Sequence, residues 1–188
     1  MDAKAHVSDL GFSYSLPADW EIVDVPPTLP SMLQKAARDY GNEAAKMAAC
    51  VQLPLTAHHG NPASAIAVVG LPFDCVGHSY TASDIPSVAS NVTDSMKNSI
   101  QITNSVINTY TLGTHSLWIQ RASGSLAGHP EIKRTVETVC GVLKKGVVCW
   151  VTMAADDAAL QTFEQGAVTL DDDAATALVP LNALQKKP

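Results

Sequence analysis

Apolar and polar residues alternate in several short segments of this chain, and in others apolar residues recur with helical spacing. Alternation is typical of half-buried strands, whereas apolar residues three and four positions apart are typical of amphipathic helices. In the first strand segment Phe12, Tyr14 and Leu16 alternate with small or polar residues. The strand patterns predict strands over 11–16, 20–24, 47–56, 63–71, 102–111, 115–123, 131–143 and 147–154.

The helical spacing occurs in three segments, each with apolar residues along one face. Residues that favour helix starts or stops flank these segments: Gly41 follows the first, Asp84 caps the second, and Asp156 or Asp157 caps the third. They predict helices over 29–40, 84–100 and 156–166. The resulting order is hairpin, helix, hairpin, helix, four-strand meander and helix.

The last two predicted strands are apolar on both of their faces. A strand of that kind must be covered on both sides, so we predict helices on each side of a mostly antiparallel sheet, an α+β fold. No repeat, linker or low-complexity tract divides the 188 residues. We therefore predict a single domain over 11–180, with an N-terminal extension over 1–10 and a C-terminal tail over 181–188.

The four cysteines are even in number, but a domain of this size needs no disulfide to fold. Cys140 and Cys149 flank the last predicted hairpin. A two-residue primed turn there would require positive φ at Lys144 and Lys145, so a type I turn with Gly146 in a bulge fits better. That register places the two thiols on opposite faces of the sheet. We therefore predict that Cys140 and Cys149 are not bonded to each other.

The charge and hydropathy of the chain limit the kinds of partner it can bind and bear on its cellular compartment. The net charge is −6 with no basic stripe, which argues against nucleic acid and against anionic membrane surfaces. No apolar run is long enough to span a bilayer, so we predict no membrane insertion. The first residues lack the features of a signal peptide. We expect a cytoplasmic protein if the chain is complete, and a periplasmic or secreted one if a leader was removed.

The order of elements, together with the opening segment GFSYSLPADW over 11–20, resembles the PsbP-like superfamily. This group includes the extrinsic photosystem protein PsbP, a Ran-binding nuclear-import factor and many uncharacterised bacterial proteins. The resemblance covers nearly the whole chain as an order of elements. It implies an α/β/α sandwich around an antiparallel sheet and a binding or assembly role, and it transfers no catalytic or binding residue.

The standard catalytic and nucleotide-binding motifs are absent from the sequence, although a triad assembled in space would not show there. His58 and His59 are weak candidates for a surface metal site, because neighbouring side chains diverge and ligand spacing is lacking. We favour a polar loop over 58–62 and predict no metal and no cofactor. The acidic run 171–173 lacks the spacing of a calcium loop, which favours a solvated acidic turn.

Two further candidates depend on side chains that the fold would have to position. Cys75 and His78 could form a nucleophile and base, but nothing in the sequence lowers the thiol pKa, and a half-buried cysteine is the favoured reading. Trp118 lies on a strand face of mixed character, and His115 begins the same strand. We name Trp118 and His115 as the candidate binding residues, with Trp118 either an exposed anchor for a partner or, as we favour, part of the core.

Three functions remain open at this point. The favoured hypothesis is a non-catalytic binding or assembly protein whose partner is a protein. The first alternative is a small-molecule or metal carrier, which requires a large apolar pocket with a few convergent polar groups. The second is an enzyme with a spatially assembled site from His58, His59, Cys75, His78 or His115.

Overall fold

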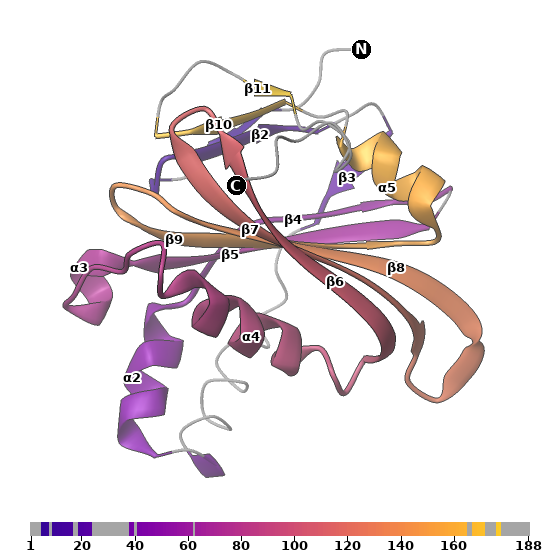
Figure 1. Cartoon of the computed structure of the whole chain (residues 1–188), viewed down its shortest axis with the longest axis horizontal. Helices are drawn as coiled ribbons and strands as arrows, with labels where there is room; N and C mark the ends of the chain where they lie inside the picture. Colours follow the sequence, from indigo (N-terminus) through magenta and orange to yellow (C-terminus); the bar gives the residue numbers. More distant parts are fainter. Residues whose placement is uncertain are drawn as a thin grey trace.

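Two antiparallel sheets account for most of the described chain in a computed structural model (Figure 1). The larger sheet has seven strands in the order β3, β4, β5, β9, β8, β7, β6. Their bounds are β3 Trp20–Ile22, β4 Gln52–His59, β5 Ser64–Pro72, β6 Ile100–Leu112, β7 His115–Leu126, β8 His129–Val142 and β9 Gly146–Ala154. The structure describes residues 5–7, 9–16, 19–23, 38–39, 41–61, 63–164, 167–171 and 176–177.

The smaller sheet brings together segments from the two halves of the sequence. Its strands run in the order β1, β2, β10, β11. Their bounds are β1 Ala5–Val7, β2 Phe12–Ser15, β10 Ala167–Leu170 and β11 Thr176–Ala177. The predicted opening hairpin is therefore wrong, because β2 pairs with β1 and β10 whereas β3 pairs with β4 in the larger sheet. Alternation identified the strand but could not identify its neighbour.

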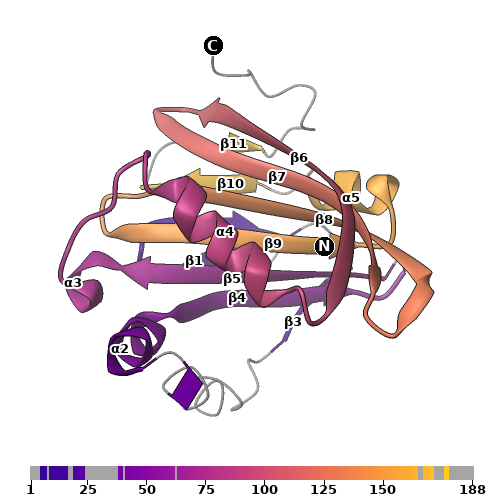
Figure 2. The same cartoon turned by 60° about the horizontal axis from the view of Figure 1, so that its bottom comes forward.

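Helices lie on both faces of the larger sheet. Helix α4 (Ile85–Ser95) crosses one face, and α5 (Asp157–Glu164) lies on the other beside the smaller sheet (Figures 1 and 2). Two further helices, α2 (Asn42–Cys50) and α3 (Phe73–Val76), are joined by a disulfide between Cys50 and Cys75. The mostly antiparallel sheet with a few helices is confirmed.

Helix α2 corrects one boundary. We predicted a strand over 47–56, but Met47–Cys50 are helical and β4 starts at Gln52. Short apolar runs are ambiguous between helix and strand, and this segment is such a run. The predicted helix over 29–40 lies outside the described residues, apart from the helical pair 38–39. Strand β1 lies within the predicted extension; the domain limits themselves stay a prediction.

The larger sheet separates two apolar cores. Beneath the smaller sheet and α5, the core includes Phe12, Trp20, Trp150 and Phe163. The Tyr14 hydroxyl in this layer donates a 2.6 Å hydrogen bond to the backbone carbonyl of Phe163. Beneath α4 a second core includes Ile85, Ala89, Trp118, Cys140, Val147 and Cys149. Both faces of the central strands are thus covered, as their apolar residues require.

The prediction for the last hairpin is wrong by one residue. Cys140 faces Cys149 directly, and the two are bonded to each other. The loop is the two lysines alone, closed by the Leu143 N–H donating to the Gly146 carbonyl at 2.8 Å. The only non-glycine residues with positive φ in the described part of the chain are Asp19 and Asp171, so the turn is not a primed one.

Tertiary contacts explain why this turn departs from the local rule. A Cβ at Gly146 would lie 2.7 Å from the Leu71 carbonyl oxygen, so the glycine provides close approach rather than positive φ. The Lys144 N–H donates to both carboxylate oxygens of Asp171 at 3.0 Å each. The Phe73 N–H donates to the Lys145 carbonyl at 2.9 Å. Partners distant in sequence therefore hold the loop in place.

Candidate interaction surface

The edge of the larger sheet at β6 is the most distinctive surface of the described chain. Strand β6 pairs with β7 on one side and lies last in the strand order, so no strand of the described residues lies against its other side (Figure 2). It is 13 residues long and contains no charged residue, proline or glycine. An edge strand presents a row of backbone N–H and C=O groups, and proteins usually shorten, charge or interrupt such edges.

Two large apolar side chains stand exposed at the middle of β6. Val106 is 63% exposed and Ile107 is 54% exposed. Adjacent strand residues point to opposite faces. Ile107 faces Gln120 and lies on the α4 face, whereas Val106 faces Arg121 and lies on the face shared with the smaller sheet. A strand added along this edge would therefore meet an apolar side chain on each face.

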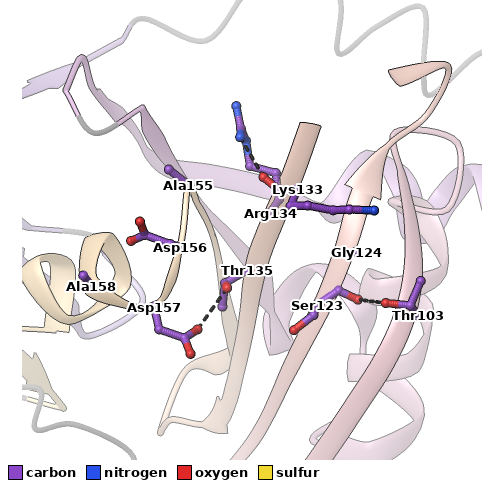
Figure 3. Close-up of a pocket in the computed structure, with 10 residues that line it drawn as sticks. All are labelled: Thr103, Ser123, Gly124, Lys133, Arg134, Thr135, Ala155, Asp156, Asp157 and Ala158. Atoms are coloured by element: carbon purple, nitrogen blue, oxygen red, sulfur yellow. Dashed lines mark hydrogen bonds between the residues drawn. The ribbon is translucent and has the colours of Figure 1, made fainter. Parts of the chain in front are cut away.

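A hollow of about 580 Å³ opens beside the first half of β6 (Figure 3). Its lining comes from β6, β7 and β8, from the residues that follow β9 and from the start of α5. The lining residues are Thr103, Ser123, Gly124, Lys133, Arg134, Thr135, Ala155, Asp156, Asp157 and Ala158. No large apolar side chain is among them. This is not the large apolar pocket that the carrier hypothesis requires.

Most of the polar groups around the hollow already have partners within the chain. The Thr135 hydroxyl donates to the Asp157 carboxylate at 2.9 Å, and the Asp156 carboxylate accepts the Ala159 N–H at 2.8 Å, which caps α5. The Thr103 hydroxyl donates to the Ser123 carbonyl at 3.0 Å. These bonds fix the hollow's walls as structural elements.

The two basic side chains at the hollow differ from its carboxylates. Lys133 and Arg134 extend in different directions from β8 (Figure 3). Arg134 donates to the Lys133 carbonyl at 2.8 Å. Within the described residues neither side chain forms an ion pair. They lie on β8, two strands in from the β6 edge, and would be available to an anionic group that covers the hollow.

The two candidate binding residues on β7 lie inside the molecule. Trp118 is 8% exposed and packs in the core beneath α4. The His115 ring is mostly buried, with Nδ1 3.4 Å from the Val142 carbonyl oxygen and Nε2 3.7 Å from the Asp171 carboxylate. Neither lies at the hollow or at the middle of β6. Their role in binding stays a prediction.

His58 and His59 lie at the end of β4 rather than in a loop. They face opposite sides of the sheet: His58 Nε2 lies 3.5 Å from the Glu21 carboxylate, and the His59 ring lies 5.7 Å from the Trp20 ring. No group of three or more potential metal-ligating side chains occurs among the residues that the structure describes. The divergence expected from neighbouring strand residues is what the structure has.

Both interpretations of Cys75 are wrong. Cys75 is bonded to Cys50 and exposed, so it is not the half-buried free cysteine that we favoured, and it has no thiol to act as a nucleophile beside His78. His78 packs its ring 4.7 Å from that of Tyr80 instead. All four cysteines are in disulfides, which removes the cysteine form of the enzyme hypothesis. The histidines named in the enzyme hypothesis lie on β4, on β7 and after α3.

The sequence analysis missed one residue and one segment that matter for this part of the molecule. Asp171 is buried with positive φ, accepts the Lys144 N–H and donates its own N–H to Gly11, so it is not a solvated turn residue. The open edge at β6 was also missed. The uncharged run over 100–112 was the available signal, because natural edge strands usually carry charge.

Hydrogen bonds to Asp84 hold the turn that precedes helix α4. The Thr81 N–H and hydroxyl donate to the Asp84 carboxylate at 2.7 and 2.8 Å. The bond from the Thr81 backbone has the larger effect, and together the two bonds hold the pKa of Asp84 below its usual value. Asp84 stands at the predicted cap position, but its side chain caps the preceding turn rather than the helix.

In the described part of the chain, no helix has the length and hydrophobicity needed to cross a bilayer.

Comparison with known proteins yields fold relatives alone. No protein-family model and no curated protein matches the chain. The solution structure of cyanobacterial PsbP (CyanoP) from Synechocystis sp. PCC 6803 is 11% identical, covers 83% of this chain and 82% of that one, and gives a TM-score of 0.44. LpqN of Mycobacterium tuberculosis, a protein involved in cell envelope biogenesis, is 18% identical over 88% of this chain and 90% of that one, with a TM-score of 0.45.

One of these two similar structures is a cyanobacterial PsbP, the kind of protein that the opening segment of this chain resembles. This likeness does not identify a site or a partner for this chain.

Proposed function

We propose that this chain is a non-catalytic protein-binding module that accepts a strand from its partner at the open edge of β6. The observation that carries the proposal is the 13-residue uncharged edge strand with Val106 and Ile107 exposed at its middle. Strand addition is a common mode of protein recognition. Main-chain hydrogen bonds supply affinity, and alternate side chains supply specificity.

The surroundings of β6 support a polypeptide as the partner. Thr103 lines the hollow from β6, whereas Lys133 and Arg134 line it from β8, with β7 between the two strands. A partner that pairs with β6 and also covers the hollow would place an acidic side chain near these cations, at the rim rather than at the centre of the interface. Rim charges of this kind favour fast association and orientation more than affinity.

The same features argue against the alternative functions. Thiol catalysis is unavailable because every cysteine is in a disulfide. The hollow has none of the large apolar side chains that line a typical carrier pocket. The two disulfides also favour the periplasmic or secreted compartment over the cytoplasm, since disulfides persist in oxidising surroundings. We interpret the architecture as an α/β/α sandwich in which the smaller sheet takes part of one helical layer.

A bait comparison tests the proposal. The native chain and the Val106→Lys/Ile107→Lys variant are immobilised and exposed to an extract of the cells that express the gene. We expect proteins retained by the native chain to be lost from the variant, because two lysines place charge on both faces of the edge. Ile22→Lys, which changes an exposed residue of β3 on the opposite edge, is the matched control and should retain them. Equal retention by all three baits would refute the proposal.

A further inference from the structure

We infer that a second copy of this chain is a partner for β6, and that the two β6 strands pair antiparallel around a two-fold axis at Val106. This inference rests on the proposed function, because it uses the same open edge. Two-fold dimers are the commonest oligomers, and their interface uses the same surface on both subunits. A single strand can satisfy that condition when its residues match themselves in reverse order.

Backbone geometry limits where such an axis can lie. Along β6 the backbone groups point alternately toward β7 and toward the open side. Two residues that face each other in an antiparallel ladder must both point their groups toward the partner or both point them away. A residue can therefore face its own copy, but it cannot face the copy of its direct neighbour. The axis must coincide with a residue, and the central candidates are Ser105, Val106 and Ile107.

Centring on Val106 pairs the two asparagines with each other. Val106 then meets its own copy, Asn104 faces Asn108 of the second copy, and Ser105 faces Ile107. The Ser105 hydroxyl already accepts a hydrogen bond from the Gln120 amide at 3.0 Å, so Ile107 leaves no amide without a partner. Facing asparagine amides can donate to and accept from each other. The central residue of the 13 is Val106 itself, and it is also the most exposed large apolar side chain of the described chain.

The neighbouring registers match less well. Centring on Ile107 places Val106 opposite Asn108, and centring on Ser105 places Asn104 opposite Val106. Each of these puts an apolar side chain against an amide that has no partner on that side. Cross-strand pairs of similar character are the favourable ones. The register at Val106 is therefore the favoured one of the three.

Charge distinguishes this edge from the rest of the molecule. The chain carries a net charge of −6, and most contacts between two copies would bring like charges together. Strand β6 carries no charge over its whole length of about 44 Å. Two β6 strands can therefore approach each other without direct repulsion. The sequence is suited to self-pairing in this respect as well.

The bulge in β6 sets the extent of the interface. The register with β7 shifts between Ile102 and Asn104, so the regular outer ladder runs from Asn104 to Asn108 on each copy. An interface built on one such strand lies at the small end of the range for specific complexes. We expect a dissociation constant on the order of 10–100 µM. The dimer should form and dissociate readily.

Sedimentation of charge variants tests the axis. The native chain should dimerise as its concentration rises from about 1 µM to about 500 µM. Val106→Lys and Val106→Glu should each weaken the dimer about tenfold or more, because like charges would meet on the axis. An equimolar mixture of the two should regain the dimer, since Lys then faces Glu. Ile22→Lys, on the other edge, should dimerise like the native chain.

Two outcomes would overturn the inference. A native chain that stays monomeric at the highest concentration has no such dimer. A mixture that associates as weakly as each variant alone places Val106 away from the axis. Thermal unfolding of each variant checks that it is folded.

A distance measurement tests the register without changing Val106. Thr111→Cys carries a nitroxide label, and the native cysteines are held in disulfides. Residue 111 lies five positions from the axis, so the two labels should be about 34 Å apart by electron–electron double resonance. An axis at Ile107 predicts about 27 Å, and one at Ser105 predicts about 41 Å. Either of these distances, or no dipolar signal at high concentration, would refute pairing at Val106.

The two proposals can fail separately. If the native chain is monomeric but the Val106→Lys/Ile107→Lys bait still loses a protein that the native bait retains, self-pairing is wrong and the proposed function stands. If the chain is monomeric and all baits retain the same proteins, both are wrong. A dimer that responds to the charge variants as expected supports both.

Discussion

The two edges of the larger sheet are built in opposite ways. Strand β3 has three residues, and its Glu21 carboxylate lies 3.5 Å from the ring of His58 on the next strand. Strand β6 has 13 residues and no charge. Shortness and charge are the usual means by which proteins prevent strands from adding to an edge. One edge of this sheet uses both, and the other uses neither.

The edges also differ in how they contribute to stability. Trp20 of β3 is 5% exposed and packs its ring 5.4 Å from that of Phe163 in the core. The middle of β6 buries little, because Val106 and Ile107 are exposed on both faces. The short edge is therefore anchored for folding. The side chains at the middle of the long edge contribute little to the fold and are available for recognition.

Removal of Trp20 should give the largest effect. Trp20→Ala removes a buried aromatic side chain and should lower the free energy of unfolding by about 3–5 kcal/mol. Urea denaturation followed by circular dichroism measures this loss. Ile22→Ala, on the same strand but exposed, should change it by less than about 0.5 kcal/mol. A loss below about 1 kcal/mol for Trp20→Ala would mean that β3 is not anchored through its tryptophan.

The disulfide between the central strands should come next. Cys140→Ala/Cys149→Ala opens a short loop and should lower the free energy of unfolding by about 3 kcal/mol. The change lies on β8 and β9, and β7 separates it from that edge. Sedimentation of the folded variant should therefore show the same self-association as the native chain. A variant that loses association would show that the long edge depends on the sheet centre.

Truncations at the middle of β6 should have small effects on folding. Val106→Ala and Ile107→Ala should each change the free energy of unfolding by less than about 0.5 kcal/mol, because both side chains are exposed. Urea denaturation at a concentration where the chain is monomeric measures this. A loss of about 2 kcal/mol or more for either variant would show that these side chains serve the core rather than a partner.

Removal of the charge from the short edge should have the smallest effect. Glu21→Val removes the exposed contact between the Glu21 carboxylate and the His58 ring, and exposed contacts of this kind contribute between about 0 and 1 kcal/mol. Because β3 has three residues, we expect no new association even at high concentration. Sedimentation of Glu21→Val beside Glu21→Gln measures this. If the valine variant associated, charge rather than length would be what protects this edge.

Local pattern predicted much of the larger sheet but not its assembly. The strands that became β5 to β9 were expected close to where they lie, because their alternation and bounding turns are clear. The pairing of β2 with β10 was not predictable, since these strands are more than 150 residues apart in the sequence. The pairing order decides which strand lies at an edge. The sequence pattern therefore could not identify the open side of β6.

The candidate site shows the same division. The side chains of Trp118 and His115 drew attention by their chemistry, yet the fold buries them. The exposed middle of β6 consists of ordinary Val and Ile residues, which no motif search selects. The error at Cys140 and Cys149 arose from trusting turn rules where Asp171 and Leu71 hold the loop instead.

The Cys140–Cys149 bond has a practical consequence for engineering. Because two sulfur atoms lock these neighbouring strands in step, the loop between them is freed from setting their alignment. Lys144 and Lys145 are exposed at its tip. A foreign peptide grafted in place of these lysines would be displayed on a clamped hairpin, at the end of β8 and β9 that lies away from the hollow.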